Sequence, residues 1–331
     1  MTRPVLSEWN GPELLYVEPT QLVKSFGYLS ARPRLAVTWD HLQNTQDRVA
    51  EADGETAAER VEFPDPASAS GAIKKLALDL GAHMAGITHV DQHHVYKGED
   101  VPHQFALVVA VPMDYDNISQ SPSINSSYEV LRVYDEIGRI ATELARYIRG
   151  RGYPARSHTL RFEQINMLPH AYAAGLGELG KHGSLINREL GCSFRVAVVT
   201  TDLPLAEDAP KAEGIDAICA HCRMCVDYCP GDAIDDEKQE VRGFYKWVVD
   251  TEACAPFWGS YHACGICLQV CPFNAKSLGG KFRKTFVKTI KSIDLPKWRE
   301  ELKESLQEPW SQVERPTEFP EDWRMQVKQK E

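Results

Sequence analysis

The sequence lacks any long apolar segment. Nowhere do about 18 apolar residues follow one another, the length that marks a candidate membrane-spanning helix. Residues 1–19 contain neither the apolar region of a secretory signal nor two consecutive arginines. We therefore expect a cytoplasmic protein without membrane contact.

Positive charge is also scarce. The chain has 37 Lys and Arg against 47 Asp and Glu, a formal net charge of −10, which disfavours nucleic-acid binding as the main task. One exception is residues 276–291, where the charged side chains are all basic: Lys276, Lys281, Arg283, Lys284, Lys288 and Lys291. A solvated basic helix is the simplest interpretation of this segment; docking of an acidic electron donor or of a nucleic acid are alternatives.

The chain has no internal repeat apart from two cysteine motifs. Its 331 residues, 43% of them hydrophobic, allow one large domain and a small one. We expect an irregular extension over residues 1–65, an α/β domain over 66–212, a cysteine-rich domain over 213–275, and a tail over 276–331 that packs back on the body.

Hydrophobic periodicity predicts helices and strands in the large domain. Residues 73–90 fit an amphipathic helix, a glycine turn and a short strand, and residues 105–113 fit a buried strand. Apolar positions three and four apart predict a long helix over 128–149, and another strand is expected over 194–203. The fold class is therefore α+β or α/β.

Eight of the nine cysteines form two motifs with metal-ligand spacing. The first has the bacterial ferredoxin pattern, in which the fourth cysteine ligates the other cluster: Cys219-x2-Cys222-x2-Cys225-x3-Cys229-Pro230. The second supplies four more thiolates: Cys254, nine intervening residues, then Cys264-x2-Cys267-x3-Cys271-Pro272. These motifs predict two 4Fe-4S clusters and single-electron chemistry.

The crossed ligation of such ferredoxins divides the eight cysteines into two sets. One cluster takes Cys219, Cys222, Cys225 and Cys271; its neighbour takes Cys229, Cys254, Cys264 and Cys267. Zinc sites or disulfides are weaker alternatives, because zinc prefers paired CxxC ligands and disulfides have no need of the proline after each last cysteine. Cys192 stands outside both motifs and is expected to be structural.

Two further motifs match known cofactor-binding patterns only in part. Gly175-Leu-Gly177-Glu-Leu-Gly180 matches the dinucleotide fingerprint, but a helix-like segment precedes it instead of a strand. Asp91-Gln-His93 begins like a cobalt-ligating DxHxxG loop, but Tyr96 replaces the final glycine. Neither motif supports a site of its own.

Residues 73–274 resemble the cobalamin-dependent reductive dehalogenases and, more distantly, the epoxyqueuosine reductases. The resemblance rests on both cysteine motifs and on four segments in this order: MDYDNISQSPS at 113–123, YIRGRGYPA at 147–155, AGLGELGKHGSLI at 174–186 and TTDLPL at 200–205. Together they are specific.

The resemblance implies a nitroreductase-like corrinoid-binding domain followed by a bacterial two-cluster ferredoxin-like domain. Electrons would pass through the clusters to cobalamin, which has no protein ligand to cobalt and supplies the difficult chemistry. The loops that the resemblance places against the corrin contain Gly175, Gly177, Gly180, Lys181, His182, Gly183, Thr201, Asp202 and Leu203.

The resemblance also implies a proton donor. Tyr134 matches the family's acid on the long helix, and Arg195 matches the basic partner whose charge favours the phenolate. Tyr128 is the competing acid. Without the resemblance, Tyr134 would be a core tyrosine with a satisfied hydroxyl, and Arg195 would form a salt bridge at a strand edge.

One departure concerns the substrate pocket. Many dehalogenases carry an asparagine after the segment that ends at Tyr153; here His158, Arg161 or Asn166 would have to substitute. We therefore expect a substrate pocket that differs from that of the respiratory dehalogenases.

The leading hypothesis is a corrinoid iron-sulfur reductase acting on a small organic halide. It would need an external electron donor such as ferredoxin or flavodoxin, and it could form a homo-oligomer. A tRNA-base reductase of the epoxyqueuosine type, another corrinoid chemistry, and an electron-transfer protein without corrinoid remain as alternatives.

Overall fold

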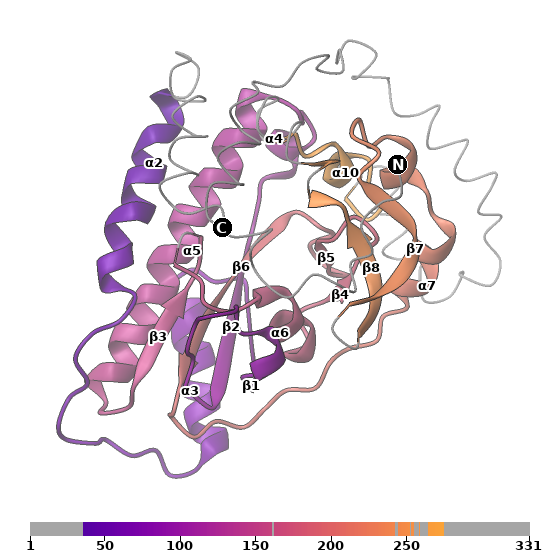
Figure 1. Cartoon of the computed structure of the whole chain (residues 1–331). Coiled ribbons are helices and arrows are strands. Elements are labelled where there is room, and N and C mark those ends of the chain that lie inside the picture. Colours follow the sequence, from indigo (N-terminus) through magenta and orange to yellow (C-terminus); the bar gives the residue numbers. More distant parts are fainter. Residues whose placement is uncertain are drawn as a thin grey trace.

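The computed structural model describes residues 36–160, 162–241, 244–251, 253–254, 258 and 264–274 (Figure 1). The expectations for most of the N-terminal extension, for Arg161, for the basic segment and for the tail over 276–331 lie outside these residues. Within them, no helix has both the length and the apolar character needed to cross a membrane.

A four-stranded sheet forms the centre of the larger part. It consists of β1 (Met84–His89), β2 (Phe105–Pro112), β6 (Phe194–Thr201) and β3 (Ala155–His158), in the order β1-β2-β6-β3. All neighbouring pairs are antiparallel. The predicted strands β2 and β6 are confirmed, and of the two fold classes predicted from the sequence the fold is α+β.

One face of the sheet is covered by the long helix α5 (Ile124–Gly150) together with α3 (Pro66–Asp79). A capping box between Ser123 and Ser126 begins α5, just after the short helix α4 (Tyr115–Ile118). Its apolar stripe is fully buried against alternate residues of the strands: Val133, Ile137, Ile140, Leu144 and Ile148 face Leu107, Val109, Ala197 and Val199. The long helix predicted from periodicity is thus confirmed.

The other face carries a smaller apolar cluster. The strand residues with the opposite parity, including Val108, Val196 and Val198, pack there against α6 (Met167–Ala173) and the segment after it. That segment forms the two-residue strands β4 (Glu178–Leu179) and β5 (Leu185–Ile186). A 3-10 turn, η5 (Gln92–His94), holds the DQH motif, and its Asp91 side chain caps the turn.

Part of the predicted irregular extension is ordered, which corrects the expectation for residues 36–65. Helix α2 (Ala36–Asp47) packs along α5, and η4 (Arg48–Glu51) follows it. Ala52 then accepts a hydrogen bond from the Ser157 backbone N–H, at the free edge of β3. The helix is anchored by polar contacts to Asp135, so its own apolar pattern is weak and periodicity did not reveal it.

The opposite edge of the sheet is covered as well. The backbone N–H of Asp208 donates to Ile87 O, and the Asp208 carboxylate accepts from Ile87 N–H and from Lys74 Nζ. The backbone N–H of Ala206 donates a hydrogen bond to the hydroxyl of Ser70 in α3. The connection between the two parts of the chain therefore lies along β1.

The cysteine-rich part contains short elements. These are α7 (Ile215–His221), α8 (Met224–Asp227), the hairpin of β7 (Ile234–Val241) and β8 (Phe244–Val249), and α10 (Ile266–Gln269). Figure 1 shows this part beside the sheet and next to β4 and β5. The sequence analysis did not foresee the hairpin, because its polar strand DDEKQE carries no strong apolar alternation.

Candidate active site

The structure brings the cysteines together in two groups of four. Cys271, which follows α10, lies beside the three thiols of the first motif. Burial is the largest cause that raises the pKa of Cys219 and of Cys225, and the thiols of Cys222 and Cys271 add to both rises. The four members are all buried: Cys219, Cys222, Cys225 and Cys271. We call them the first thiol group.

The second thiol group contains Cys229, Cys254, Cys264 and Cys267. Burial raises the pKa of Cys254 to about 12, and the nearby thiols of Cys264 and Cys229 add to the rise. Burial likewise raises the pKa of Cys267, whose neighbours include the other three members and also Cys225 of the first group. The two groups are therefore adjacent.

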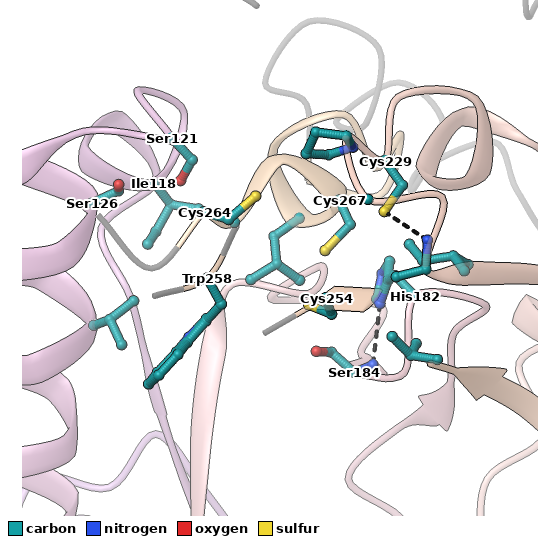
Figure 2. Close-up of a pocket in the computed structure, with 18 of the residues that line it drawn as sticks. Ile118, Ser121, Ser126, His182, Ser184, Cys229, Cys254, Trp258, Cys264 and Cys267 are labelled. Atoms are coloured by element: carbon teal, nitrogen blue, oxygen red, sulfur yellow. Dashed lines mark hydrogen bonds between the residues drawn. The ribbon is translucent and has the colours of Figure 1, made fainter. Parts of the chain in front are cut away.

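A cavity of about 170 Å³ opens beside the second thiol group. Figure 2 shows the four cysteines of this group around one space, with Trp258 on one side and His182 on the other. The remaining wall is mainly apolar and comes from α4, α5 and α10, through Ile118, Val130 and Leu268. Ser121, Ser126 and Trp258 were not foreseen as site residues; a tryptophan inside the nine-residue gap of the second motif was the available signal.

Arg195 also borders this cavity and contacts Tyr134. Its Cζ atom lies 5.1 Å from the centre of the Tyr134 ring, a cation–π distance. Val130 and Arg195 border the cavity. Tyr134 lies one helical turn beyond Val130 on α5 and is not among the described residues that border it. The Arg195 Nε atom is buried and has no hydrogen-bond partner in the described structure. Arg195 therefore connects Tyr134 with the cavity, and its Nε is a buried donor without a partner among the described residues.

Tyr128 faces a different neighbour. Its ring lies edge-on to His41 of α2, with 5.2 Å between the ring centres, and the residue is 36% exposed. Asp135, seven residues later on α5, also faces α2. The competing acid is thus on the side of α5 that packs against α2.

The glycines predicted to face the corrin are packed against the chain itself. A Cβ atom would lie 2.6 Å from Ala209 O at Gly175, 2.5 Å from Ile186 O at Gly177 and 2.9 Å from Val249 Cγ2 at Gly183, and at Gly180 it would meet Ile186. Gly177 and Gly183 also have positive φ angles of 156° and 79°. Close protein packing therefore explains these glycines without a cofactor.

Between the glycines, Glu178 holds the two parts of the protein together. Its buried carboxylate accepts hydrogen bonds from the backbone N–H groups of Glu213, Gly214 and Asp216, at the start of α7. Glu178 was not predicted as a functional residue; an acid between two glycines, in a segment that leads to the cysteines, was the available signal.

The residues predicted after β6 lie away from Arg195. Arg195 is the second residue of β6 and Thr201 is the last, so the two lie six residues, or roughly 20 Å, apart along the strand. The Thr201 hydroxyl donates to Pro154 O, the Asp202 carboxylate accepts from Gln104 N–H, and Leu203 is buried in the main core. Their role in binding a corrin stays a prediction.

His158 and Asn166, the suggested substitutes for the missing asparagine, lie on the other face of the sheet. His158 pairs with Val198, on the α6 side, and its Nε2 is 2.9 Å from Thr200 Oγ1. Burial lowers the pKa of His158 to about 3, so this imidazole is neutral at physiological pH. Asn166 caps α6. Neither side chain joins Tyr134 and Arg195.

Lys181 and His182 lie beside the first thiol group. The Lys181 backbone N–H lowers the pKa of Cys219 by hydrogen bonding to its sulfur, against the larger effect of burial. A ring nitrogen of His182, Cys192 Sγ and Cys271 Sγ lie within 4.8 Å of one another. Cys192 is thus buried next to a predicted ligand, and its thiol donates to Leu268 O at 3.6 Å.

Comparisons with known proteins agree with this geometry. Residues 218–275 match the family of 4Fe-4S dicluster domains. A tetrachloroethene reductive dehalogenase of Desulfitobacterium hafniense is 36% identical over 182 residues, which are 51% of this chain and 32% of that protein. The catabolic reductive dehalogenase NpRdhA, solved in complex with 3-bromo-4-hydroxybenzoic acid, superposes with a TM-score of 0.72 and 25% identity, over 84% of this chain and 41% of that one.

This chain is similar to reductive dehalogenases in sequence and fold over part of their length. More distantly, an epoxyqueuosine reductase of Leadbetterella byssophila is 34% identical over 112 residues, 32% of this chain and 36% of that protein. The chain spans about a third of the length of the Desulfitobacterium dehalogenase and about two fifths of the solved one. The predicted resemblance to both families is confirmed.

In this dehalogenase-like chain, the cysteine groups fit iron–sulfur clusters. Each group offers four sulfur ligands. Burial raises the pKa of thiols such as Cys225 and Cys267, so a bound metal cation is needed to hold them as thiolates. Backbone N–H groups also point at the sulfurs, as in the 3.3 Å hydrogen bond from Ala233 to Cys229. The donor chemistry is that of 4Fe-4S ligation.

The described residues do not offer a comparable site for a corrinoid. The cavity beside Arg195 is smaller than the roughly 300–1,000 Å³ of ordinary small-molecule sites, and a corrinoid exceeds most molecules of that class. The glycine loop offers no open cradle. The described residues therefore fit two clusters and do not, as they stand, fit a corrinoid.

Proposed function

We propose that this protein is an iron–sulfur reductase that removes halide from a small organic molecule. The overall reaction is R–X + 2e⁻ + H⁺ → R–H + X⁻, in which the carbon–halogen bond breaks and a carbon–hydrogen bond forms. One observation carries the proposal: Arg195, which contacts the Tyr134 ring at 5.1 Å, borders the same cavity as the second thiol group.

The two thiol groups would supply the electrons. Adjacent 4Fe-4S clusters pass electrons one at a time, so two transfers complete one turnover. Because the first group is buried and the second borders the cavity, we assign the order first cluster, second cluster, cavity. An external donor such as ferredoxin or flavodoxin would reduce the first cluster.

Tyr134 would supply the proton. Tyr134 does not itself border the cavity, so a substrate held there would extend past Arg195 to meet the Tyr134 hydroxyl. The O–H bond breaks as the proton moves to the carbon that has lost the halide, and the Arg195 guanidinium stabilises the phenolate left behind. The mainly apolar cavity wall excludes water, which favours a small apolar substrate and strengthens this charge pairing. Arg195 Nε remains available to a substrate or a leaving halide.

Cobalamin in a nitroreductase-like domain is what the resemblance implies, and such a cofactor would supply a low-valent metal. Because the described residues do not fit a corrinoid, no step of the proposal is assigned to it. The residue assignments for it, from Gly175 to Gly183 and from Thr201 to Leu203, rest on the resemblance. Cytoplasmic location and a homo-oligomeric state likewise remain predictions.

The decisive experiment counts iron, sulfide and cobalt in protein purified without oxygen from cells supplied with cobalamin. It then measures halide release from a panel of halogenated compounds with reduced viologen as donor. About eight irons and one cobalt per chain, together with halide release, would support the proposal.

Other results would overturn it. About eight irons without cobalt, even after reconstitution, would leave an electron-transfer protein. A cobalt-loaded protein that converts an epoxyqueuosine-containing tRNA and releases no halide would indicate the tRNA-base reductase.

A further inference from the structure

Lys181 is the most buried lysine among the described residues. Its side chain is 1% exposed, and it is the largest of the fully buried side chains in that part of the protein. Lysines are almost never buried this completely unless their charge is paired and used. The residue lies in a turn, Gly180 to Gly183, that packs against β8 of the cysteine-rich part.

The charge of Lys181 is held in place from two sides. Its Nζ atom is 2.6 Å from Asp236 Oδ1 and 4.7 Å from the centre of the Trp247 ring. Asp236 is also paired with Arg223, which belongs to the first cysteine motif. Arg223 also pairs with Asp227 at 3.2 Å, so the network holds two cations and two carboxylates, and Lys181 is its one fully buried charge.

This positive charge lies beside the first thiol group. Burial lowers the pKa of Lys181, and the thiols of Cys225, Cys219 and Cys222 act against this effect. The Lys181 backbone N–H also bonds to Cys219. Both the backbone and the side chain of one residue therefore face the ligands of one predicted cluster.

His182 approaches the same cluster from the side of Cys271. Its Nδ1 accepts a hydrogen bond from Ser184 N–H at 3.2 Å, which leaves the ring proton of the neutral imidazole on Nε2. Nε2 is buried and has no hydrogen-bond partner in the described structure, while a ring nitrogen lies within 4.8 Å of Cys271 Sγ. If Cys271 holds iron as a thiolate, its Sγ would be the acceptor for this N–H.

We propose that Lys181, supported by His182, sets the reduction potential of the cluster held by the first thiol group. Reduction adds one negative charge to a site that is already negative, so a fixed cation and an N–H donor stabilise the reduced form. This raises the potential of the first cluster and makes it the better acceptor for the external donor. The proposal rests on the cluster assignment and not on the substrate.

The test is an anaerobic redox titration of both clusters, followed by EPR spectroscopy. Lys181→Met should lower the ratio of reduced to oxidised first cluster about tenfold at a fixed potential, a shift of about 59 mV for one electron. Asp236 keeps its partner Arg223 in this variant, so no buried acid is left unpaired. Lys181→Arg should restore the ratio, and His182→Phe should lower it in the same direction by a smaller factor.

Lys238 provides the matched control. It also pairs with a carboxylate at 2.6 Å, Asp216, and it also contacts the Trp247 ring, at 5.1 Å. Its side chain is 21% exposed, so water screens its charge. Lys238→Met should leave both titration curves within about twofold of the wild-type ratio.

Three outcomes would overturn the proposal, each in a distinct way. Eight irons with unchanged potentials in Lys181→Met would remove this inference and leave the proposed function intact. Unchanged potentials with a loss of cobalt would return Lys181 to the corrin-facing role. Too little iron in the wild-type protein would remove the clusters, and with them the proposed function as well.

Discussion

At the scale of single residues, the surroundings of a sulfur atom separate a ligand from a structural cysteine. Cys222 and Cys192 are both buried, but Cys222 lies within the first thiol group, whereas Cys192 borders it and donates to a backbone carbonyl. We expect Cys222→Ser to reduce the iron content from about eight to about four per chain and to bleach part of the visible absorption. Iron analysis checks this.

Cys192→Ser is the control for that experiment, and it should retain about eight irons. Unchanged iron in Cys222→Ser would contradict the ligand assignment. Loss of iron in both variants would mean that Cys192 supports a cluster.

The choice of acid is also made at this scale. Tyr134→Phe should lower the rate of halide release by roughly 10²–10⁴-fold, the usual contribution of a general acid, with iron and cobalt content unchanged. The matched variant is Tyr128→Phe, because Tyr128 lies on the same helix but faces His41. If Tyr128→Phe releases halide slowly while Tyr134→Phe keeps its activity, then Tyr128 is the acid and Tyr134 is not.

At the scale of secondary-structure elements, α2 and α5 are joined by a polar contact. Asp135 accepts hydrogen bonds from Asn44 at 2.9 Å and from Arg48, and it contacts His41 at 2.8 Å. Burial alone would raise the pKa of Asp135, but these partners outweigh it and lower the pKa below 3.8. The ionised carboxylate therefore stabilises the packing of α2.

The sign of this shift gives a pH-dependent prediction. A depressed folded-state pKa contributes stability that is complete above about pH 4 and is lost as the pH falls through that folded-state pKa. Asp135→Asn should reduce the free energy of unfolding by about 1.5–3 kcal/mol at pH 7 and by less below about pH 4. Urea titrations at several pH values measure this difference.

Asp79→Asn is the control, because Asp79 forms an exposed pair with Lys75 four residues away. Its effect should stay below about 0.5 kcal/mol. Equal losses in the two variants would remove the special role of Asp135.

These elements also show what the sequence could predict. Helix α5 and strands β2 and β6 follow from local periodicity, because each buries an apolar stripe or run that is contiguous in the sequence. Helix α2 could not be predicted in this way, since its anchor is Asp135, 91 residues from Asn44. The cysteine grouping was predictable from spacing, whereas the closed glycine loop depends on Ala209, Ile186 and Val249, which only the fold brings near.

At the scale of the whole molecule, the cysteine-rich part depends on its metal. The helices α7, α8 and α10 contain seven, four and four residues, too few to be stable in isolation, and the four cysteines of the first thiol group belong to the core among the described residues. We expect iron removal to expose this part to trypsin at Arg223 and Lys238 while the sheet and α5 remain folded. Limited proteolysis with mass spectrometry, on the holo- and apoprotein of the full chain, tests this.

A matching cleavage pattern in the two forms would contradict the prediction. Cleavage within α5 in the apoprotein would instead show that both parts unfold together. Arg149, buried in α5 and bonded to Ala155 O at 2.9 Å, is a suitable internal reference because it should stay resistant in both.

The connection along β1 has a consequence for the rate of electron delivery. Residues 206–208 are hydrogen-bonded to β1 and α3, and Glu178 holds the residues that begin α7. These hydrogen bonds fix the connection between the two parts, so the fold sets the distance between the thiol groups and Arg195. Because electron tunnelling weakens exponentially with distance, we expect the internal transfer rate to be the same in every molecule and insensitive to solvent viscosity.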